Sequence, residues 1–126
     1  MITKTIQFPV LVEDLEAAKA FYTQKFGFTI VREEEFSPDW KYLTVAPQKD
    51  NETVIELLEA KTGEQKAQIG KQVHIQLATD DIQKDYAVLK SRGVIFHSAP
   101  KNVPGGKGAP FEDLCGNVFD LYQKIS

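Results

Sequence analysis

The sequence predicts an α+β protein built from two tandem βαβββ modules, because the 126-residue chain repeats itself. Residues 7–15 (QFPVLVEDL) are answered by residues 74–82 (HIQLATDDI), and Asp14 and Asp81 lie 67 positions apart. In each half, a segment of alternating apolar residues, typical of a strand, precedes a segment with apolar residues three or four positions apart, typical of a helix. A repeat of this length sets the architecture of the whole chain, so we expect each element to occur twice.

The first half begins with a strand over residues 5–12, in which Pro9 favours an edge position because proline has no N–H for a ladder bond. Asp14 is expected to cap a helix over about 15–26, which Gly27 ends. Three further strands are expected at residues 28–36, 40–46 and 53–58.

The second half repeats this order after a low-pattern segment, with Asp81 expected to open its helix and Gly93 to close it. The expected elements are a strand at 72–78, a helix at 81–92, a strand at 94–97, a strand that ends at 111–112 and a last strand at 118–123. Residues 100–110 are rich in glycine and proline and are therefore expected to form a loop. We predict a single domain over 1–126, with repeat 1 at about 5–59, a linker at about 60–71 and repeat 2 at about 72–124.

Composition excludes several classes of function. The net charge of −3 and the isoelectric point near 5.4 argue against nucleic acid or an anionic membrane surface as the main partner. No apolar run approaches the roughly 18 residues that a membrane span needs. The N-terminus lacks a signal-peptide pattern, and the single cysteine, Cys115, rules out an internal disulfide. We therefore expect a protein of the cytoplasm.

Four polar residues occupy equivalent places in the two repeats: Gln7 with His74, and Glu56 with Asp120. Each is flanked by two apolar residues, and side chains alternate across a strand, so the four are expected on the face opposite the core. Such a face is often simply solvated. If the two sheets curve around a shared interior, however, the four side chains converge, and their oxygen and nitrogen atoms suit a divalent metal such as Zn, Ni, Co, Mn or Fe. The flanking pairs are Ile6 and Phe8, Ile55 and Leu57, Val73 and Ile75, and Phe119 and Leu121.

Nearly the whole chain resembles the vicinal oxygen chelate superfamily, which includes glyoxalase I, extradiol dioxygenases, and the fosfomycin and bleomycin resistance proteins. The resemblance rests on Val12–Asp14, on Ala20–Tyr22, on Phe26–Phe28 and on the turn Asp113–Asn117. It implies a curved, mostly antiparallel eight-stranded sheet around a central site, and a homodimer. These motifs are specific for the fold and poorly specific for the activity.

The resemblance also implies roles for the four polar residues. Gln7, Glu56, His74 and Asp120 fall where glyoxalase I places its metal ligands, and the carboxylates Glu56 and Asp120 would move the proton. Asp120 is one methylene group shorter than the Glu expected there, which puts its reach to both metal and substrate in doubt.

Four further residues are predicted to contact a substrate: Arg32, Trp40, Phe111 and Tyr122. Tyr122 shares the face of Asp120 by two-residue spacing. For most aromatic residues core packing is the simpler expectation, and Tyr42, Phe96 and Lys107 are weaker candidates. His97 is expected at the end of a strand, and nothing near Cys115 in the sequence suggests an activated thiolate.

Two functions remain open, both with a small molecule as partner. The first is a metal-dependent lyase or isomerase of glyoxalase type, acting on a small vicinal-oxygen substrate such as a 2-oxoaldehyde–thiol hemithioacetal. The second is a metal-free binding protein of bleomycin-resistance type, in which the four polar residues hydrogen-bond to one another beside an apolar, aromatic-lined groove. A fosfomycin-type transferase is weaker, since it would want two histidines and a glutamate at the site.

Overall fold

The computed structural model describes residues 1–125, which fall into two compact units, residues 1–69 and the residues from Gly70 onward. The last position of the predicted single domain, Ser126, lies outside the described residues. Within the described part there are nine strands and three helices, so the predicted α+β class is confirmed. None of the helices in this part is long and apolar enough to cross a bilayer.

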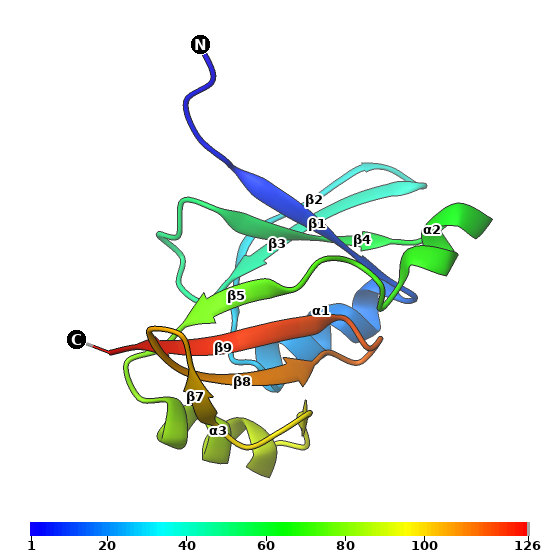
Figure 1. Cartoon of the computed structure of the whole chain (residues 1–126). Helices are drawn as coiled ribbons and strands as arrows, with labels where there is room; N and C mark the ends of the chain where they lie inside the picture. The colour runs from blue at the N-terminus through cyan, green and yellow to red at the C-terminus, as the bar shows by residue number, and fades with distance from the viewer. Residues whose placement is uncertain (126) are drawn as a thin grey trace. The chain divides into compact units, whose positions relative to one another are not determined.

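Unit 1 is a four-stranded mixed sheet with two helices (Figure 1). The strands run in the order β1-β4-β3-β2; β1 and β4 are parallel, and the other neighbours are antiparallel. Pro9 lies on β1, an edge strand of this sheet, as predicted. The elements are β1 (Gln7–Val12), α1 (Leu15–Gln24), β2 (Thr29–Ser37), β3 (Trp40–Ala46), β4 (Val54–Glu59) and α2 (Gly63–Gln68).

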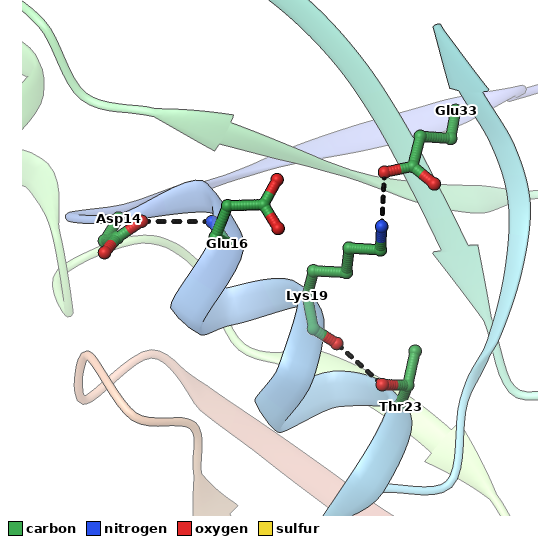
Figure 2. Close-up of polar contacts among 5 residues, drawn as sticks. All are labelled: Asp14, Glu16, Lys19, Thr23 and Glu33. Atoms are coloured by element: carbon green, nitrogen blue, oxygen red, sulfur yellow. Dashed lines mark hydrogen bonds and ion pairs between the residues drawn. The ribbon is translucent and has the colours of Figure 1, made fainter.

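Polar contacts fix both the start of α1 and its position beside the sheet (Figure 2). The carboxylate of Asp14 accepts a hydrogen bond from the backbone N–H of Glu16 at 3.0 Å, so the predicted cap is confirmed. The ammonium of Lys19 contacts the Glu33 carboxylate on β2 at 2.6 Å, and this hydrogen bond raises the pKa of Lys19. Thr23 donates to the backbone carbonyl of Lys19 at 2.8 Å. The helix is thus tied at its first turn by a cap and at its middle to a strand.

The opposite face of α1 builds the core of unit 1. Leu15, Ala18 and Tyr22 are buried at the spacing that the sequence predicted. The Tyr22 ring packs edge-on against Phe26, with ring centres 5.0 Å apart. The chain then turns at Gly27, whose φ of 75° is a conformation that residues with a Cβ rarely adopt.

Unit 2 repeats this plan with one strand more than the predicted βαβββ module, so its sheet has five strands and the two sheets together have nine strands in the described residues rather than the predicted eight. Its strands run in the order β5-β9-β8-β6, with β7 paired to β8; β5 and β9 are parallel. Asp81 caps the helix by accepting from the backbone N–H of Lys84 at 3.1 Å, and Gly93 follows its end with a φ of 90°. The elements are β5 (Ile75–Ala78), α3 (Ile82–Ser91), β6 (Ile95–Phe96), β7 (Lys101–Val103), β8 (Gly106–Glu112) and β9 (Val118–Lys124).

The prediction of a loop over residues 100–110 is wrong. This segment holds β7 and most of β8, joined by a tight turn at Pro104 and Gly105. A Cβ added at Gly106 would lie 2.0 Å from the Gln123 carbonyl oxygen on β9. Gly106 therefore permits a close approach of two backbones within a sheet. The glycine-rich composition of residues 100–110 alone does not distinguish this role from that of a loop.

The predicted linker contains a short helix, α2, that its sequence did not suggest. Thr62 accepts from the backbone N–H of Gln65 at 3.1 Å, and the Gln65 side chain accepts in return from the Thr62 N–H at 3.3 Å. This reciprocal capping box satisfies N–H groups that a six-residue helix would otherwise leave without partners.

The apolar pairs that flank the four polar residues are buried in only half of the cases. Ile55, Leu57, Phe119 and Leu121 lie in the cores of their units, as predicted. Ile6 and Val73, by contrast, are 62% and 81% exposed, and His74 and Val73 precede β5 rather than lie on it. The difference follows from position: β4 and β9 are internal strands that contact a helix, whereas β1 and β5 are at the edges of their sheets.

The cap at Asp14 gives a direct test of this local account. We expect Asp14→Ala to lower the free energy of unfolding by about 1 kcal/mol, because the N–H of Glu16 loses its acceptor. Asp14→Asn keeps an acceptor oxygen and should stay close to the original protein. Urea denaturation measures both, and equal stabilities for the Ala and Asn variants would show that the cap does not stabilise α1.

Candidate functional sites

The parallel pairing of β1 with β4 brings the first predicted polar pair together in unit 1. Pro9, two residues after Gln7, lies opposite Glu56 in the register, and the amide nitrogen Nε2 of Gln7 donates to Glu56 Oε1 at 3.1 Å. The other amide atom, Oε1 of Gln7, accepts from the hydroxyl of Tyr42 on β3 at 2.5 Å. Tyr42, Gln7 and Glu56 thus form a hydrogen-bonded chain across three neighbouring strands.

Glu56 is half-buried at the end of this chain. Burial raises the pKa of its carboxyl above the usual value, because removal from water penalises the charged form. A carboxyl with a raised pKa is more readily protonated near neutral pH than a solvated one, which is a property that proton-transfer groups share. Structural carboxylates show it as well, so the shift alone does not assign a role.

An aromatic patch lies on β2 and β3 beside this chain, and we define it as Phe36, Trp40 and Tyr42. Phe36 and Trp40 pack with ring centres 4.8 Å apart, and Trp40 is 52% exposed. The guanidinium of Arg32 lies over the Tyr42 ring at 5.2 Å and over the Phe36 ring at 5.8 Å. Glu34 holds the guanidinium by two contacts of 2.8 and 2.9 Å and raises the pKa of Arg32.

The second predicted polar pair meets in unit 2, more loosely. The ring atom Nδ1 of His74 lies 3.7 Å from Oδ2 of Asp120, beyond hydrogen-bond length but within ion-pair range when the imidazole is protonated. The His74 side chain is largely exposed, whereas that of Asp120 is partly covered. The parallel pairing of β5 with β9 produces this contact, as the equivalent pairing does in unit 1.

Asp120 and Tyr122 lie in a cavity of about 370 Å³ in unit 2. Part of its lining comes from the paired strands β8 and β9, in which Gly108 is opposite Tyr122 and Pro110 is opposite Asp120. The hydroxyl of Tyr122 donates to the Pro104 carbonyl at 3.3 Å and so holds the turn between β7 and β8. The lining residues are Gln76, Lys101, Val103, Pro104, Gly108, Ala109, Pro110, Asp120, Leu121 and Tyr122.

This cavity has the composition of a binding site for a small organic molecule. Its walls are mainly apolar, and four groups able to bond to a ligand come from the three strands β5, β7 and β9: the amide of Gln76, the ammonium of Lys101, the carboxylate of Asp120 and the phenol of Tyr122. A mostly apolar cavity of at least about 300 Å³ with a few convergent polar groups is the usual form of such a site.

Of the four residues predicted to contact a substrate, Phe111 is placed differently from the others. It is 1% exposed and packs between Phe96 and Phe119, with ring centres 5.2 and 5.8 Å away, in the core of unit 2. Its ring is therefore not open to a ligand. Arg32 and Trp40 lie at the aromatic patch of unit 1, and Tyr122 lies in the cavity of unit 2.

Neither unit on its own fits a metal ion. Each supplies two of the four predicted ligands, whereas zinc sites in proteins have three or four protein ligands. In unit 1, the Gln7 oxygen and one Glu56 oxygen already accept hydrogen bonds from Tyr42 and from the Gln7 amide. Among the described residues of either unit, no three His, Cys, Asp or Glu side chains are arranged to hold a metal. The four-residue metal site would combine both units and stays a prediction.

Gln76, Lys101 and Val103 are among the cavity residues that the sequence pattern did not single out. Gln76 lies two positions after His74, and in the strand expected over 72–78 the alternation rule would have placed both on one face, so the sequence held a signal for it. Lys101 and Val103 lie on β7, within the segment predicted to be a loop, where no periodicity marked them.

Known proteins resemble this chain over nearly its whole length. YetH from Bacillus subtilis (strain 168), an uncharacterized protein, is 33% identical over 121 residues that cover 96% of this chain and 98% of YetH. A probable chloroplastic lactoylglutathione lyase from Arabidopsis thaliana is 32% identical over 120 residues, covering 90% of this chain; the match spans 33% of that protein. The crystal structure of TnmS3, an antibiotic binding protein from Streptomyces sp. CB03234, has a TM-score of 0.85, with 35% identity and 98% of both chains covered.

The family model for the Glyoxalase/Bleomycin resistance protein/Dioxygenase superfamily matches residues 4–121. This match covers all four polar residues of the repeat and every helix and strand of the described structure except the last three residues of β9. The resemblance stated from the sequence motifs is thereby confirmed. The chain belongs to the Glyoxalase/Bleomycin resistance protein/Dioxygenase superfamily, the vicinal oxygen chelate superfamily of proteins.

Proposed function

We propose that this protein binds a small, largely apolar organic molecule in the cavity of unit 2, without needing a metal ion. The observation that carries the proposal is the cavity itself, about 370 Å³ with apolar walls and with Asp120 and Tyr122 in its lining. Apolar walls supply affinity by removing ligand surface from water, and the few polar groups orient the ligand.

The hydrogen bonds of unit 1 favour binding without metal. The metal-free alternative predicted that the four polar residues would hydrogen-bond to one another or to water. Gln7 bonds to Glu56, and it also accepts from Tyr42, whereas His74 and Asp120 lie 3.7 Å apart. To ligate a metal, these groups would have to exchange bonds that already satisfy them, at a cost of about 1 kcal/mol or more for each bond. The similarity to TnmS3, an antibiotic binding protein, supports a role in ligand binding.

Filling the cavity should abolish binding of a small apolar probe. A Cβ added at Gly108 would lie 3.4 Å from the Val103 methyl carbons, so the longer side chain of Gly108→Leu would occupy the cavity. We expect the original protein to bind 8-anilinonaphthalene-1-sulfonate (ANS), and Gly108→Leu to weaken this binding at least tenfold. ANS fluorescence titration measures both.

Gly63→Leu is the matched control, because it introduces the same side chain where an added Cβ meets nothing within 4 Å. We expect this variant to bind ANS like the original protein. Thermal melting checks that both variants are folded. Equal ANS affinity in the original protein and in Gly108→Leu, or no binding by the original protein, would contradict the proposed site.

A metal-dependent lyase is the second candidate, favoured by the match to a probable lactoylglutathione lyase and by the raised pKa of Glu56. Members of this superfamily often use divalent metals. In this reading Gln7, Glu56, His74 and Asp120 would hold a Zn, Ni, Co, Mn or Fe ion. The metal would polarise the oxygens of a hemithioacetal substrate, and Glu56 or Asp120 would move the proton.

Turnover of the methylglyoxal–glutathione hemithioacetal separates the two candidates. If the protein is a metal-free binding protein, we expect no turnover above background even when Ni²⁺ or Zn²⁺ is added. If the lyase candidate is right, metal stimulates turnover, and Glu56→Gln lowers it at least 100-fold while Glu52→Gln, at an exposed carboxylate in the same unit, leaves it unchanged. The assay is followed by thioester absorbance, with metal content measured on the same samples.

We also propose that the protein is a homodimer of the cytoplasm. The exposed apolar side chains of Ile6 and Phe8 at the edge strand β1 support the dimer, since an uncovered apolar edge favours association. The single cysteine is compatible with a reducing compartment.

A further inference from the structure

The two repeats carry different residues at one position of the sheet face that holds the carboxylate, Glu56 in unit 1 and Asp120 in unit 2. This position determines whether a side chain of the protein occupies the space beside the carboxylate. In unit 1, Thr44 on β3 lies opposite Glu56; in unit 2, Pro110 on β8 lies opposite Asp120. Two residues earlier on the same face, unit 1 has Tyr42 and unit 2 has Gly108. Tyr42 and Gly108 therefore occupy equivalent positions in the repeat, and Gly108 lines the cavity.

The phenol of Tyr42 makes two kinds of contact in unit 1. Its hydroxyl donates to Gln7, the equivalent of His74, and Gln7 in turn donates to Glu56, the equivalent of Asp120. Its ring lies 5.2 Å below the guanidinium of Arg32, a favourable arrangement of a cation over an aromatic face.

Unit 2 offers related contacts, and Gly108 has no side chain in the place of the Tyr42 ring, while Tyr122 lies opposite Gly108 and lines the same cavity. The acceptor here is Asp120, the equivalent of Glu56, whereas Tyr42 donates to Gln7. Asp120 provides a hydrogen-bond acceptor in the cavity, with His74 within 3.7 Å of it. Lys101 lies opposite Gly108 in the register of β7 and β8, so a cation adjoins the place where a ring would lie. Among the described residues Lys101 has no ion-pair partner, so its charge is available to a ligand.

We infer that the cavity of unit 2 takes a phenolic aromatic compound, with its ring over Gly108 beside Lys101 and its hydroxyl donating to Asp120. In unit 1 the phenol is the side chain of Tyr42, and in unit 2 the equivalent phenol would belong to a ligand bound from solution. The inference rests on the proposed function, since it names the ligand class of the same cavity.

The test compares 2-naphthol with 2-methoxynaphthalene, which has the same rings but no hydroxyl hydrogen to donate. We expect the original protein to bind 2-naphthol about tenfold more tightly or better, because a hydrogen bond to a charged acceptor contributes more than one between neutral groups. Asp120→Leu, which removes the acceptor at similar size, should reduce the ratio of the two affinities to about one. Isothermal titration calorimetry measures all four affinities.

Gly108→Tyr supplies the phenol from the chain itself and should weaken 2-naphthol binding at least tenfold. The Gly63→Tyr variant is its control and should bind like the original protein. Thermal melting verifies folding, and Gly108→Leu is the second blocking variant if Gly108→Tyr does not fold.

The outcomes separate the inference from the proposed function. If ANS binds and is displaced by filling the cavity, but 2-naphthol shows no preference over its methyl ether, the phenolic assignment is wrong and the cavity remains a binding site. A preference that persists in Asp120→Leu also overturns the assignment. If neither ANS nor 2-naphthol binds, both the ligand class and the proposed function fail.

Discussion

The parallel pairing of the first and last strands in each unit is the constraint on which both sites depend. β1 pairs with β4, and β5 pairs with β9, although a helix and further strands separate them in the chain. A parallel pair needs a long connection, and here the intervening elements of the βαβββ module provide it. This pairing sets Gln7 beside Glu56 and His74 beside Asp120, residues 49 and 46 positions apart.

The two units use this shared geometry differently. In unit 1, Tyr42 completes a chain of hydrogen bonds to Gln7 and Glu56, so the polar groups satisfy one another. In unit 2, Gly108 leaves space beside Asp120, and the cavity takes the place of the phenol. The two modules thus share their backbone pairing but differ at the position of Tyr42 and Gly108, beside a closed polar cluster in unit 1 and a cavity, which we propose as the ligand site, in unit 2.

The sequence predicted what periodicity and local chemistry encode. The caps at Asp14 and Asp81 and the turns at Gly27 and Gly93 followed from spacing, and side-chain alternation marked Gln7, Glu56, His74 and Asp120, which meet in two pairs, one in each unit. The strands β7 and β8 did not, because Gly106 serves a close backbone approach that looks like loop composition. The cavity was not predicted either. Lys101 and Val103 of its lining lie on β7, which pairs with β8 in a segment whose composition indicated a loop.

The pairing of Gln7 with Glu56 can be observed directly by following the side-chain amide signals of Gln7 in ¹⁵N-resolved NMR spectra across pH. Because Gln7 donates to Glu56, whose pKa burial raises, its amide signals should shift with an inflection above the usual carboxyl range. The inflection should vanish in Glu56→Gln and persist in Glu52→Gln. Signals that do not respond to pH, or that respond equally in Glu56→Gln, would contradict the strand pairing on which both proposed sites rest.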